Sequence, residues 1–507
     1  MRVYNTLGGR KEELTTLSPH KVNMYVCGPT TYNYIHLGNA RPLVVFDSLR
    51  RYLEYQGYEV TYIQNFTDVD DKIIRRAQEE NDDPLLLAQR YIDEYFKDAD
   101  GLNIKRATVH PQVSRHIPDI INAVAGLIEK GHAYAVDGDV YFRVRSFPAY
   151  GKLSGREQEE MLAGARVEVD ERKDDPADFA LWKAAKPGEP YWDSPWGHGR
   201  PGWHIECSVM ATRYLGNSID IHGGGSDLIF PHHENEIAQA EALTGEPFAR
   251  YWMHNGFITV NKEKMSKSLG NFFLLRDILA KFPADVVRFY LIATHYRSPL
   301  DFDDSKLEEA RKALGRLKNA LLLADEFLGS KNSLPKETAP LPAEMINMAD
   351  EYERQFGEAL DDDFNTALAI GHLFDLTRTL NGLIAGGDPA KDNDRLIIKK
   401  WAATLRRLGE VLGLFDAPRE IVSGESGFSE EKAQVLKSEE ILNEIMAVRS
   451  NARKAKNFAL ADEIRDFLGG QGVTIVDTAE GPRPRYEAIK DLSALKAKLD
   501  EWRGGQA

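Results

Sequence analysis

The chain has 507 residues, 42% of them hydrophobic and 28% charged, which is typical of a globular protein long enough for several domains. Two cysteines are too few for a disulfide framework and suit a reducing compartment. The net charge of −15 argues against indiscriminate nucleic-acid binding but leaves room for a local patch. Because no apolar run approaches the ~18 residues of a membrane span and no signal core precedes the first domain, we expect a cytoplasmic protein.

The first patterned region predicts a strand, a helix and a second strand. The apolar strand covers residues 22–26 and ends at Cys27; the helix covers residues 42–56, and the second strand covers residues 60–63. This order predicts half of a doubly wound parallel sheet, in which ligands bind at the carboxyl ends of the strands. The loop of residues 65–71 follows the second strand and lies on the same rim as Cys27.

An insertion is predicted to interrupt the sheet from about residue 95 to residue 200. It contains a helix at residues 117–130 and a hairpin, because Asp137-Gly138 separates two short strand-like runs. A stretch rich in proline, glycine and tryptophan at residues 186–201 ends the insertion.

The sheet is predicted to resume at residues 219–221, followed by a glycine loop at residues 223–225. A helix is then expected to begin at Phe230-Pro231 and to stop at Gly245. On such a helix His232 and Glu236 lie four residues apart and share one face, as two ligands of a divalent metal require.

Both cysteines lie next to predicted strand ends, which makes them candidates to join that pair. We hypothesise that Cys27, Cys207, His232 and Glu236 converge on one zinc ion, since two thiolates, one imidazole and one carboxylate fill its usual four positions. The spacing alone leaves open the alternative of two buried free cysteines without a metal. A metalloprotease is excluded, because the HExxH pattern begun by His233 has isoleucine in place of its second histidine.

Two further stretches have the composition of phosphate-binding loops. His36-Leu37-Gly38-Asn39 combines an imidazole, a glycine and a helix amino terminus, which together favour a triphosphate. Lys264-Met265-Ser266-Lys267-Ser268, after a strand predicted at residues 257–260, offers two lysines that can stabilise charge developing on phosphates. Asp227 could accept ribose hydroxyls or cap a turn.

After about residue 299 the pattern becomes helical, with apolar residues three and four apart. A proline-containing linker at residues 334–342 precedes two or three more helices before residue 414. A loose stretch at residues 417–428 leads to a small terminal unit with a predicted strand at residues 473–476 and a basic turn at residues 483–486. Residues 441–507 carry 11 basic and 10 acidic side chains, so this segment is nearly neutral in a chain with a net charge of −15. Such a local reduction of negative charge suits a surface that faces phosphates.

We therefore predict an α/β fold with a Rossmann-like catalytic sheet, an insertion, a helical bundle and a small carboxyl-terminal α/β unit. The predicted divisions are the first half of the catalytic domain at 1–94, the insertion at 95–200, the second half at 201–255, a loop and stem-contact region at 256–304, the bundle at 305–416 and the linker with the terminal domain at 417–507.

Five motifs together resemble the cysteinyl-tRNA synthetase family of class I aminoacyl-tRNA synthetases. They are CGPTTYNYIHLGNARP, NFTDVDDKI, PGWHIECSVM, IHGGGSDLIFPHHENEIAQAE and KMSKSLGNFF, in the family's order. One departure is Asn39, which occupies the fourth place of the HIGH signature, where histidine is typical; asparagine can still donate a hydrogen bond to phosphate.

The resemblance implies that Cys27, Cys207, His232 and Glu236 hold one zinc ion that binds the sulfur of the substrate cysteine. It also implies an activation step with Mg-ATP and transfer to cysteine tRNA by a protein that we expect to be a monomer. His36, Asn39, Lys264 and Lys267 are then expected to act on the phosphates, Gly38, Asp227 and Lys267 to bind the nucleotide, and Thr67 and Trp203 to line the cysteine pocket.

Two alternatives remain at this stage. A cysteine ligase of the mycothiol-biosynthesis type has a similar catalytic core but transfers cysteine to an amino-sugar; it needs no anticodon-binding end, whereas more than 200 residues follow Ser268 here. A non-catalytic tRNA-binding paralogue would have degraded nucleotide signatures, and both signatures are present.

Overall fold

The computed structural model divides into two compact units, Met1–Pro418 and Arg419–Ala507, which we treat separately. It describes residues 1–155, 171–260, 263–264, 273–329 and 343–415 of the first unit. In the second unit it describes residues 442, 445–446, 448–449, 452, 457–471, 473–478, 481–485, 494–496, 498–499 and 502. None of the described helices is both long enough and apolar enough to cross a membrane.

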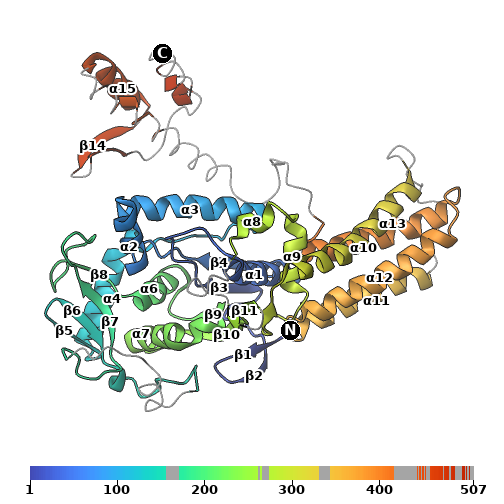
Figure 1. The fold of residues 1–507 in the computed structure, drawn as a ribbon, viewed down its shortest axis with the longest axis horizontal. Helices are drawn as coiled ribbons and strands as arrows, with labels where there is room; N and C mark the ends of the chain where they lie inside the picture. Colours follow the sequence, from blue (N-terminus) through green and yellow to red (C-terminus); the bar gives the residue numbers. More distant parts are fainter. Residues whose placement is uncertain are drawn as a thin grey trace. The chain divides into compact units, whose positions relative to one another are not determined.

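A four-stranded parallel sheet forms the centre of the first unit, as predicted (Figure 1). The strand order is β10-β9-β3-β4, with β3 at Lys21–Val26, β4 at Glu59–Gln64, β9 at Ile219–Gly225 and β10 at Ala249–Asn255. Each neighbouring pair is parallel. The strands are buried over most of their length, as expected where helices cover a parallel sheet. β10 has no counterpart among the predicted strands.

The glycine run was expected to be a loop, and this is wrong, because Gly223 to Gly225 form the end of β9. A Cβ atom at Gly223 would lie 2.4 Å from the ring of Phe46, and one at Gly224 would lie 2.9 Å from the ring of His233. Gly223 and Gly224 therefore allow the Phe46 and His233 rings to approach the strand closely.

Two helices begin at other residues than predicted. The helix α1 spans Leu37–Tyr55 rather than residues 42–56, because His36 and Asn39 form a capping box ahead of it. The helix α7 spans Glu234–Thr244, and the preceding turn, Ile229–His233, contains the extended residue Phe230, with φ −138° and ψ 133°. The predicted end of α7 is confirmed, since Gly245 adopts φ +78°.

Between β4 and β9 lie helices and a second, antiparallel sheet. The helices are α2 (Asp71–Glu80), α3 (Pro84–Gly101), α4 (Ile117–Glu129) and α6 (Trp203–Leu215), and the sheet has the order β5-β6-β7-β8 at Ala133–Val136, Asp139–Phe142, Phe179–Ala184 and Gly199–Pro201. The predicted hairpin is confirmed: Asp137 and Gly138 have φ values of 50° and 86°, as its tight turn requires.

The remaining part of the first unit is mostly helical, as the 3-4 pattern predicted. It contains the hairpin β1 (Arg2–Asn5) and β2 (Arg10–Glu13), the sheet β12-β11-β13 (Glu263–Lys264, Ile258–Val260 and Leu300–Asp301), and the helices α8 (Leu275–Leu279), α9 (Ala284–Ile292), α10 (Asp304–Leu328), α11 (Ala343–Asp361), α12 (Thr366–Gly386) and α13 (Asp392–Val411). The predicted linker at residues 334–342 lies outside the described residues.

The second unit has its own apolar core, built around Ile464, Leu468 and Trp502. It contains α15 (Phe458–Gly470), β14 (Thr474–Thr478) and β15 (Gly481–Arg485). The predicted basic turn is wrong for residues 483–485, which pair in register with β14. The loose stretch at residues 417–428 lies outside the described residues.

Candidate active site and metal centre

The four proposed metal ligands converge at the carboxyl end of β3. Cys27 follows β3, Cys207 belongs to α6, His232 lies in the turn before α7, and Glu236 belongs to the first turn of α7. The Cys27 Sγ atom lies 3.7 Å from Cys207 Sγ, 3.6 Å from His232 Nε2 and 3.4 Å from Glu236 Oε1. One donor atom of each residue lies within 4.8 Å of the others.

These separations fit a tetrahedral zinc ion. Usual zinc bond lengths place two sulfur donors about 3.8 Å apart, sulfur and nitrogen or oxygen about 3.6 Å apart, and nitrogen and oxygen about 3.4 Å apart. The corresponding sulfur distances here are within 0.2 Å of those values, whereas His232 Nε2 and Glu236 Oε1 are closer, at 2.9 Å. The donor types also match, because thiolate and imidazole are preferred zinc ligands.

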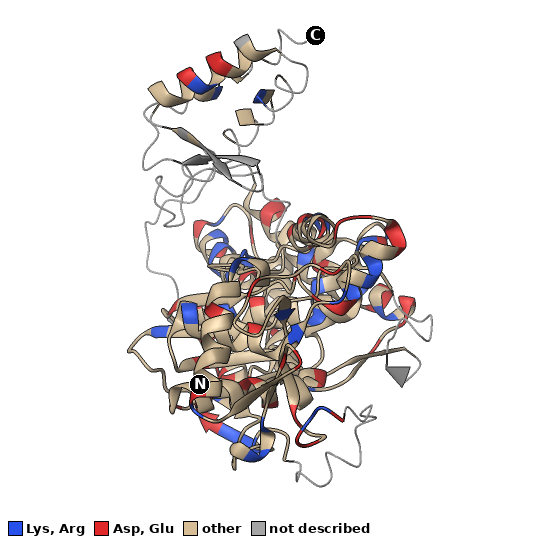
Figure 2. Cartoon of the chain, turned by 90° about the vertical axis from the view of Figure 1, so that its left-hand side faces the viewer, with Lys and Arg blue, Asp and Glu red and all other residues tan. Residues whose placement is uncertain are grey.

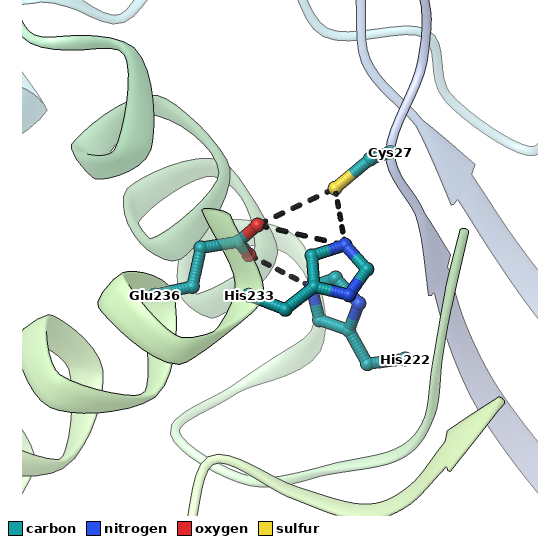
Figure 3. A group of neighbouring side chains, drawn as sticks. All are labelled: Cys27, His222, His233 and Glu236. Carbon is teal, nitrogen blue, oxygen red and sulfur yellow. Dashed lines mark hydrogen bonds and ion pairs between the residues drawn. The ribbon is translucent and has the colours of Figure 1, made fainter. Parts of the chain in front are cut away.

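A second, overlapping group of side chains also has one donor atom of each residue within 4.8 Å of the others, and it is drawn in Figure 3. It replaces Cys207 and His232 by His222 and His233. The His222 Nε2 atom bonds the other carboxylate oxygen of Glu236, at 2.8 Å, and His233 Nε2 lies 3.4 Å from Cys27 Sγ. The group Cys27, Cys207, His232 and Glu236, called the metal cluster below, has the donor set better suited to zinc, because it contains two thiolates; with a metal there, His222 would orient the Glu236 carboxylate.

Further histidines extend this arrangement away from the metal cluster. The Nδ1 atoms of His204 and His232 lie 2.9 Å apart, and His233 Nδ1 lies 2.8 Å from His254 Nε2. His254 Nδ1 lies 2.8 Å from the Thr6 hydroxyl. The roles of His222 and His254 were missed, because no spacing along the chain predicts that β9 and β10 lie side by side.

The buried charges of the metal cluster stabilise one another. Burial alone raises the pKa of Glu236, but His222 and His232 outweigh it and hold the pKa of that carboxyl well below its usual range. Burial alone lowers the pKa of His232, whereas Glu236 and Cys207 raise the pKa to about 10. Burial also raises the pKa of the Cys27 thiol well above its usual value. Burial would raise the pKa of Cys207 as well, but hydrogen bonds from Cys27 and His232 outweigh it and lower that pKa to about 6.

A cavity of about 350 Å³ connects the metal cluster with the helix amino terminus at His36. Its lining includes Cys27 and Trp203 from the metal side and His36, Gly38, Asn39 and Asp227 from the predicted nucleotide side. Trp203 is 39% exposed and stacks on His232, with 4.2 Å between the ring centroids. The cavity can therefore hold one molecule that contacts both groups.

The remaining predicted site residues either make contacts within the protein or lie outside the described residues. His36 Nδ1 accepts a hydrogen bond from the Asn39 amide, and Asn39 Oδ1 accepts one from the His36 amide, so both cap α1. Thr67 is buried and does not line the cavity; its hydroxyl donates to Glu206 Oε2 at 2.9 Å. The backbone of Lys264 lies in β12, and Lys267 lies outside the described residues.

Comparisons with known proteins define first the class of this chain. The family model described as tRNA synthetases class I (C) catalytic domain matches residues 13–312, and that described as DALR domain matches residues 355–416. Among solved structures, methionyl-tRNA synthetase of Mycobacterium tuberculosis bound by methionyl-adenylate superposes with a TM-score of 0.59 at 15% identity, covering 82% of this chain and 94% of that one. The chain is a class I aminoacyl-tRNA synthetase.

Curated relatives then define the particular family. The chain is 60% identical over 488 residues to cysteine–tRNA ligase of Pelotomaculum thermopropionicum, covering 95% of this chain and 99% of the relative. It is 57% identical to the ligase of the same name from Moorella thermoacetica, with the same coverage of both chains. The chain belongs to the cysteine–tRNA ligase family, as the five motifs predicted.

Proposed function

We propose that this enzyme activates L-cysteine with ATP and transfers it to the terminal adenosine of cysteine tRNA. The observation that carries the proposal is the convergence of Cys27, Cys207, His232 and Glu236 beside a cavity that also reaches His36. A proposed sulfur-binding site and a helix amino terminus that can bind phosphate thus lie at the same cavity. Family membership over nearly the whole chain supports the same reaction.

The metal cluster would hold one zinc ion. When bound, the zinc would supply a Lewis acid with affinity for the substrate thiolate. A free thiol with a pKa of about 8.5 is only a few per cent ionised at pH 7, a cost of about 2 kcal/mol that coordination overcomes. Serine differs from cysteine only by oxygen in place of sulfur, and a pocket without a metal discriminates such near-isosteres poorly. The thiolates Cys27 and Cys207 would therefore set the amino-acid specificity through the metal that they hold.

The first step joins cysteine to the nucleotide. A carboxylate oxygen of cysteine attacks the α-phosphorus of Mg-ATP, the bond to the β-phosphate oxygen breaks, and pyrophosphate leaves as cysteinyl-adenylate forms. His36, Lys264 and Lys267 would stabilise the charge on the phosphates, with Asn39 assisting. Asp227 and Gly38 would contact the nucleotide, and positioning rather than a covalent nucleophile would accelerate the step.

The second step transfers the cysteinyl group. A ribose hydroxyl of the tRNA's terminal adenosine attacks the acyl carbon, loses its proton, and displaces AMP. Trp203, which lines the cavity beside His232, would hold the cysteine during both steps. Thr67 does not line the cavity, so its contribution to cysteine binding would be indirect; its hydroxyl donates a hydrogen bond to Glu206 Oε2.

We further propose that residues 417–507 bind the anticodon region of the tRNA and that the protein works as a monomer in the cytoplasm. Deleting residues 417–507 is expected to reduce transfer to tRNA at least 10-fold while ATP–pyrophosphate exchange stays within twofold. The first unit is compact by itself, which makes the truncation a fair test. Unchanged transfer would contradict the anticodon assignment. The amino-sugar ligase alternative is not favoured, because relatives named cysteine–tRNA ligase match through 95% of the chain.

The decisive experiment is ATP–pyrophosphate exchange with cysteine and serine, combined with metal analysis of the purified protein. We expect exchange with cysteine, at least ~100-fold less with serine, and about one zinc per chain. Equal exchange with both amino acids, or full activity in protein without zinc, would contradict the proposed function.

A further inference from the structure

Two chain segments that carry the nucleotide signatures are joined by backbone hydrogen bonds. The Leu37 amide donates to the Phe273 carbonyl at 3.0 Å, and the Leu275 amide donates to the Ile35 carbonyl at 3.0 Å. His36 and Leu274 thus form an isolated antiparallel bridge. Residues 273–275 directly follow the segment that contains Lys267, so this bridge connects its carboxyl-terminal end to the start of α1.

Arg276, the residue that follows residues 273–275, contacts both Tyr34 and helix α3. Arg276 is in the first turn of α8, and its guanidinium lies 3.7 Å from the centroid of the Tyr34 ring. Its Nη2 atom donates to Glu94 Oε2 at 2.7 Å and to Asp98 Oδ1 at 3.1 Å. Tyr34 lines the cavity, whereas both carboxylates belong to α3, which Figure 1 shows beside α8.

The surroundings make this contact stronger than an ordinary surface ion pair. The side chains of Arg276 and Asp98 are 29% and 6% exposed, so solvent screens the pair only in part. The flat guanidinium stacks on Tyr34 while its edge donates to two carboxylates, a combination that lysine cannot reproduce. The Tyr34 ring also packs nearly perpendicular to the Tyr91 ring, with 5.3 Å between the ring centroids.

We propose that Arg276 is a positioning residue that keeps the two nucleotide signatures in register. Through Arg276, two parts of the chain are attached to helix α3. One is Tyr34, two residues before His36, and the other is α8, which begins at Leu275 just after the KMSKSLGNFF motif. The inference rests on the proposed function for its kinetic consequence, but its structural consequence stands independently, because the bridge between residues 35–37 and 273–275 can be observed without catalysis.

The kinetic test compares Arg276→Ala with Arg90→Ala. Arg90 is a matched control on α3, since it pairs with Glu80 and Asp82 and lies 5.5 Å from the Tyr91 ring, but it contacts neither signature. We expect Arg276→Ala to lower kcat for ATP–pyrophosphate exchange on the order of 10- to 100-fold, because a misplacement of about 1 Å costs that much. The KM for cysteine should stay within twofold, since the metal cluster is not touched, and Arg90→Ala should leave both constants unchanged.

Two further variants separate stacking from charge. Arg276→Lys keeps a cation near Glu94 and Asp98 but loses the flat stack, and Tyr34→Leu removes the ring; each should lower kcat several-fold and less than Arg276→Ala. Amide hydrogen exchange provides the structural readout: Leu37 and Leu275 should exchange at least 10-fold faster in Arg276→Ala than in Arg90→Ala. This readout needs no catalysis.

The outcomes are distinguishable. Unchanged exchange at Leu37 and Leu275 in Arg276→Ala, or a kcat within twofold of the Arg90→Ala value, would overturn the inference. Faster exchange throughout the protein, with a melting temperature far below that of Arg90→Ala, would show a role in overall stability instead and would also overturn it. If the wild-type enzyme showed no cysteine-dependent pyrophosphate exchange, the proposed function would fail, while the amide exchange would still decide the role of Arg276.

Discussion

The metal cluster and the His36 loop (His36 to Asn39) line the same cavity but are built in different ways. Cys207, His232 and Glu236 are at most 1% exposed, and each donor atom of the cluster lies near another donor or an orienting histidine. His36 and Asn39 are half-buried and are held to each other by the cap of α1. The proposed amino-acid site is thus buried, whereas the proposed phosphate site is a helix terminus open to the cavity.

The buried charge of the metal cluster also differs from the charges on the protein surface. The buried carboxylate Glu236 lies within hydrogen-bond distance of His222 and His232. On the face drawn in Figure 2, lysine and arginine are interspersed with aspartate and glutamate rather than gathered in one region. Solvent and salt screen a buried charge such as Glu236 far less than the exposed charges on that face. Four predictions test how far the two regions differ.

The largest effect is expected where a thiolate is removed from the metal cluster. Cys207→Ser should abolish stoichiometric zinc binding and lower cysteine-dependent pyrophosphate exchange about 1,000-fold or more, because a hydroxyl is a poor zinc ligand and specificity depends on the metal. Glu241→Gln, which alters another carboxylate of α7 that pairs with Lys152, is the control and should keep its zinc. Full zinc content in Cys207→Ser would refute our choice between the two overlapping donor groups.

On the nucleotide side, Lys267→Ala should reduce the rate of adenylate formation at least ~100-fold, the scale of losing one donor to a developing oxyanion. The zinc content should not change, because the metal cluster is separate. Lys312→Ala, at an exposed position of α10, is the control. Near-normal pyrophosphate exchange in Lys267→Ala would remove this lysine from the mechanism.

A smaller effect is expected from the histidine that orients the Glu236 carboxylate. His222→Gln should weaken zinc binding by about 10- to 100-fold, as measured by competition with a chelator, since residues that orient metal ligands contribute on that scale. His110→Gln is the control, because His110 is half-buried, its Nδ1 atom lies 3.0 Å from the Gln64 carbonyl oxygen, and it belongs to neither group of candidate metal ligands. Equal zinc affinity in the two variants would mean that His222 does not support the metal.

The smallest effect is expected at the helix cap. Asn39→Ala should cost about 1 kcal/mol of stability and lower the activation rate several-fold, since Asn39 Oδ1 accepts the His36 amide hydrogen. Asn365→Ala is the matched control, because Asn365 caps α12 by accepting from the Leu368 amide. Thermal unfolding should shift similarly in both variants, with the kinetic loss confined to Asn39→Ala. An equal kinetic loss in both would show that Asn39 has no role near the phosphates.

Local sequence signals predicted many of the elements well but placed some of their ends incorrectly. The Asp137-Gly138 hairpin and the stop at Gly245 follow from backbone preferences of single residues, so the sequence sufficed. The start of α7 was misplaced, because the extended backbone of Phe230 interrupts a pattern that otherwise continues as a helix. The glycine run was misread as a loop, since only its packing against Phe46 explains the missing side chains.

For the site, the sequence by itself determined the candidate metal ligands, because Cys27, Cys207, His232 and Glu236 are recognisable as donors by type and motif. Only the tertiary structure decided that His222 bonds Glu236, that His254 bonds His233 and that Arg276 lies on the Tyr34 ring, since strand pairing and helix packing bring these residues of β9, β10 and α8 to their partners. Donor chemistry is local to each side chain, whereas the orientation of a donor depends on neighbours distant in sequence.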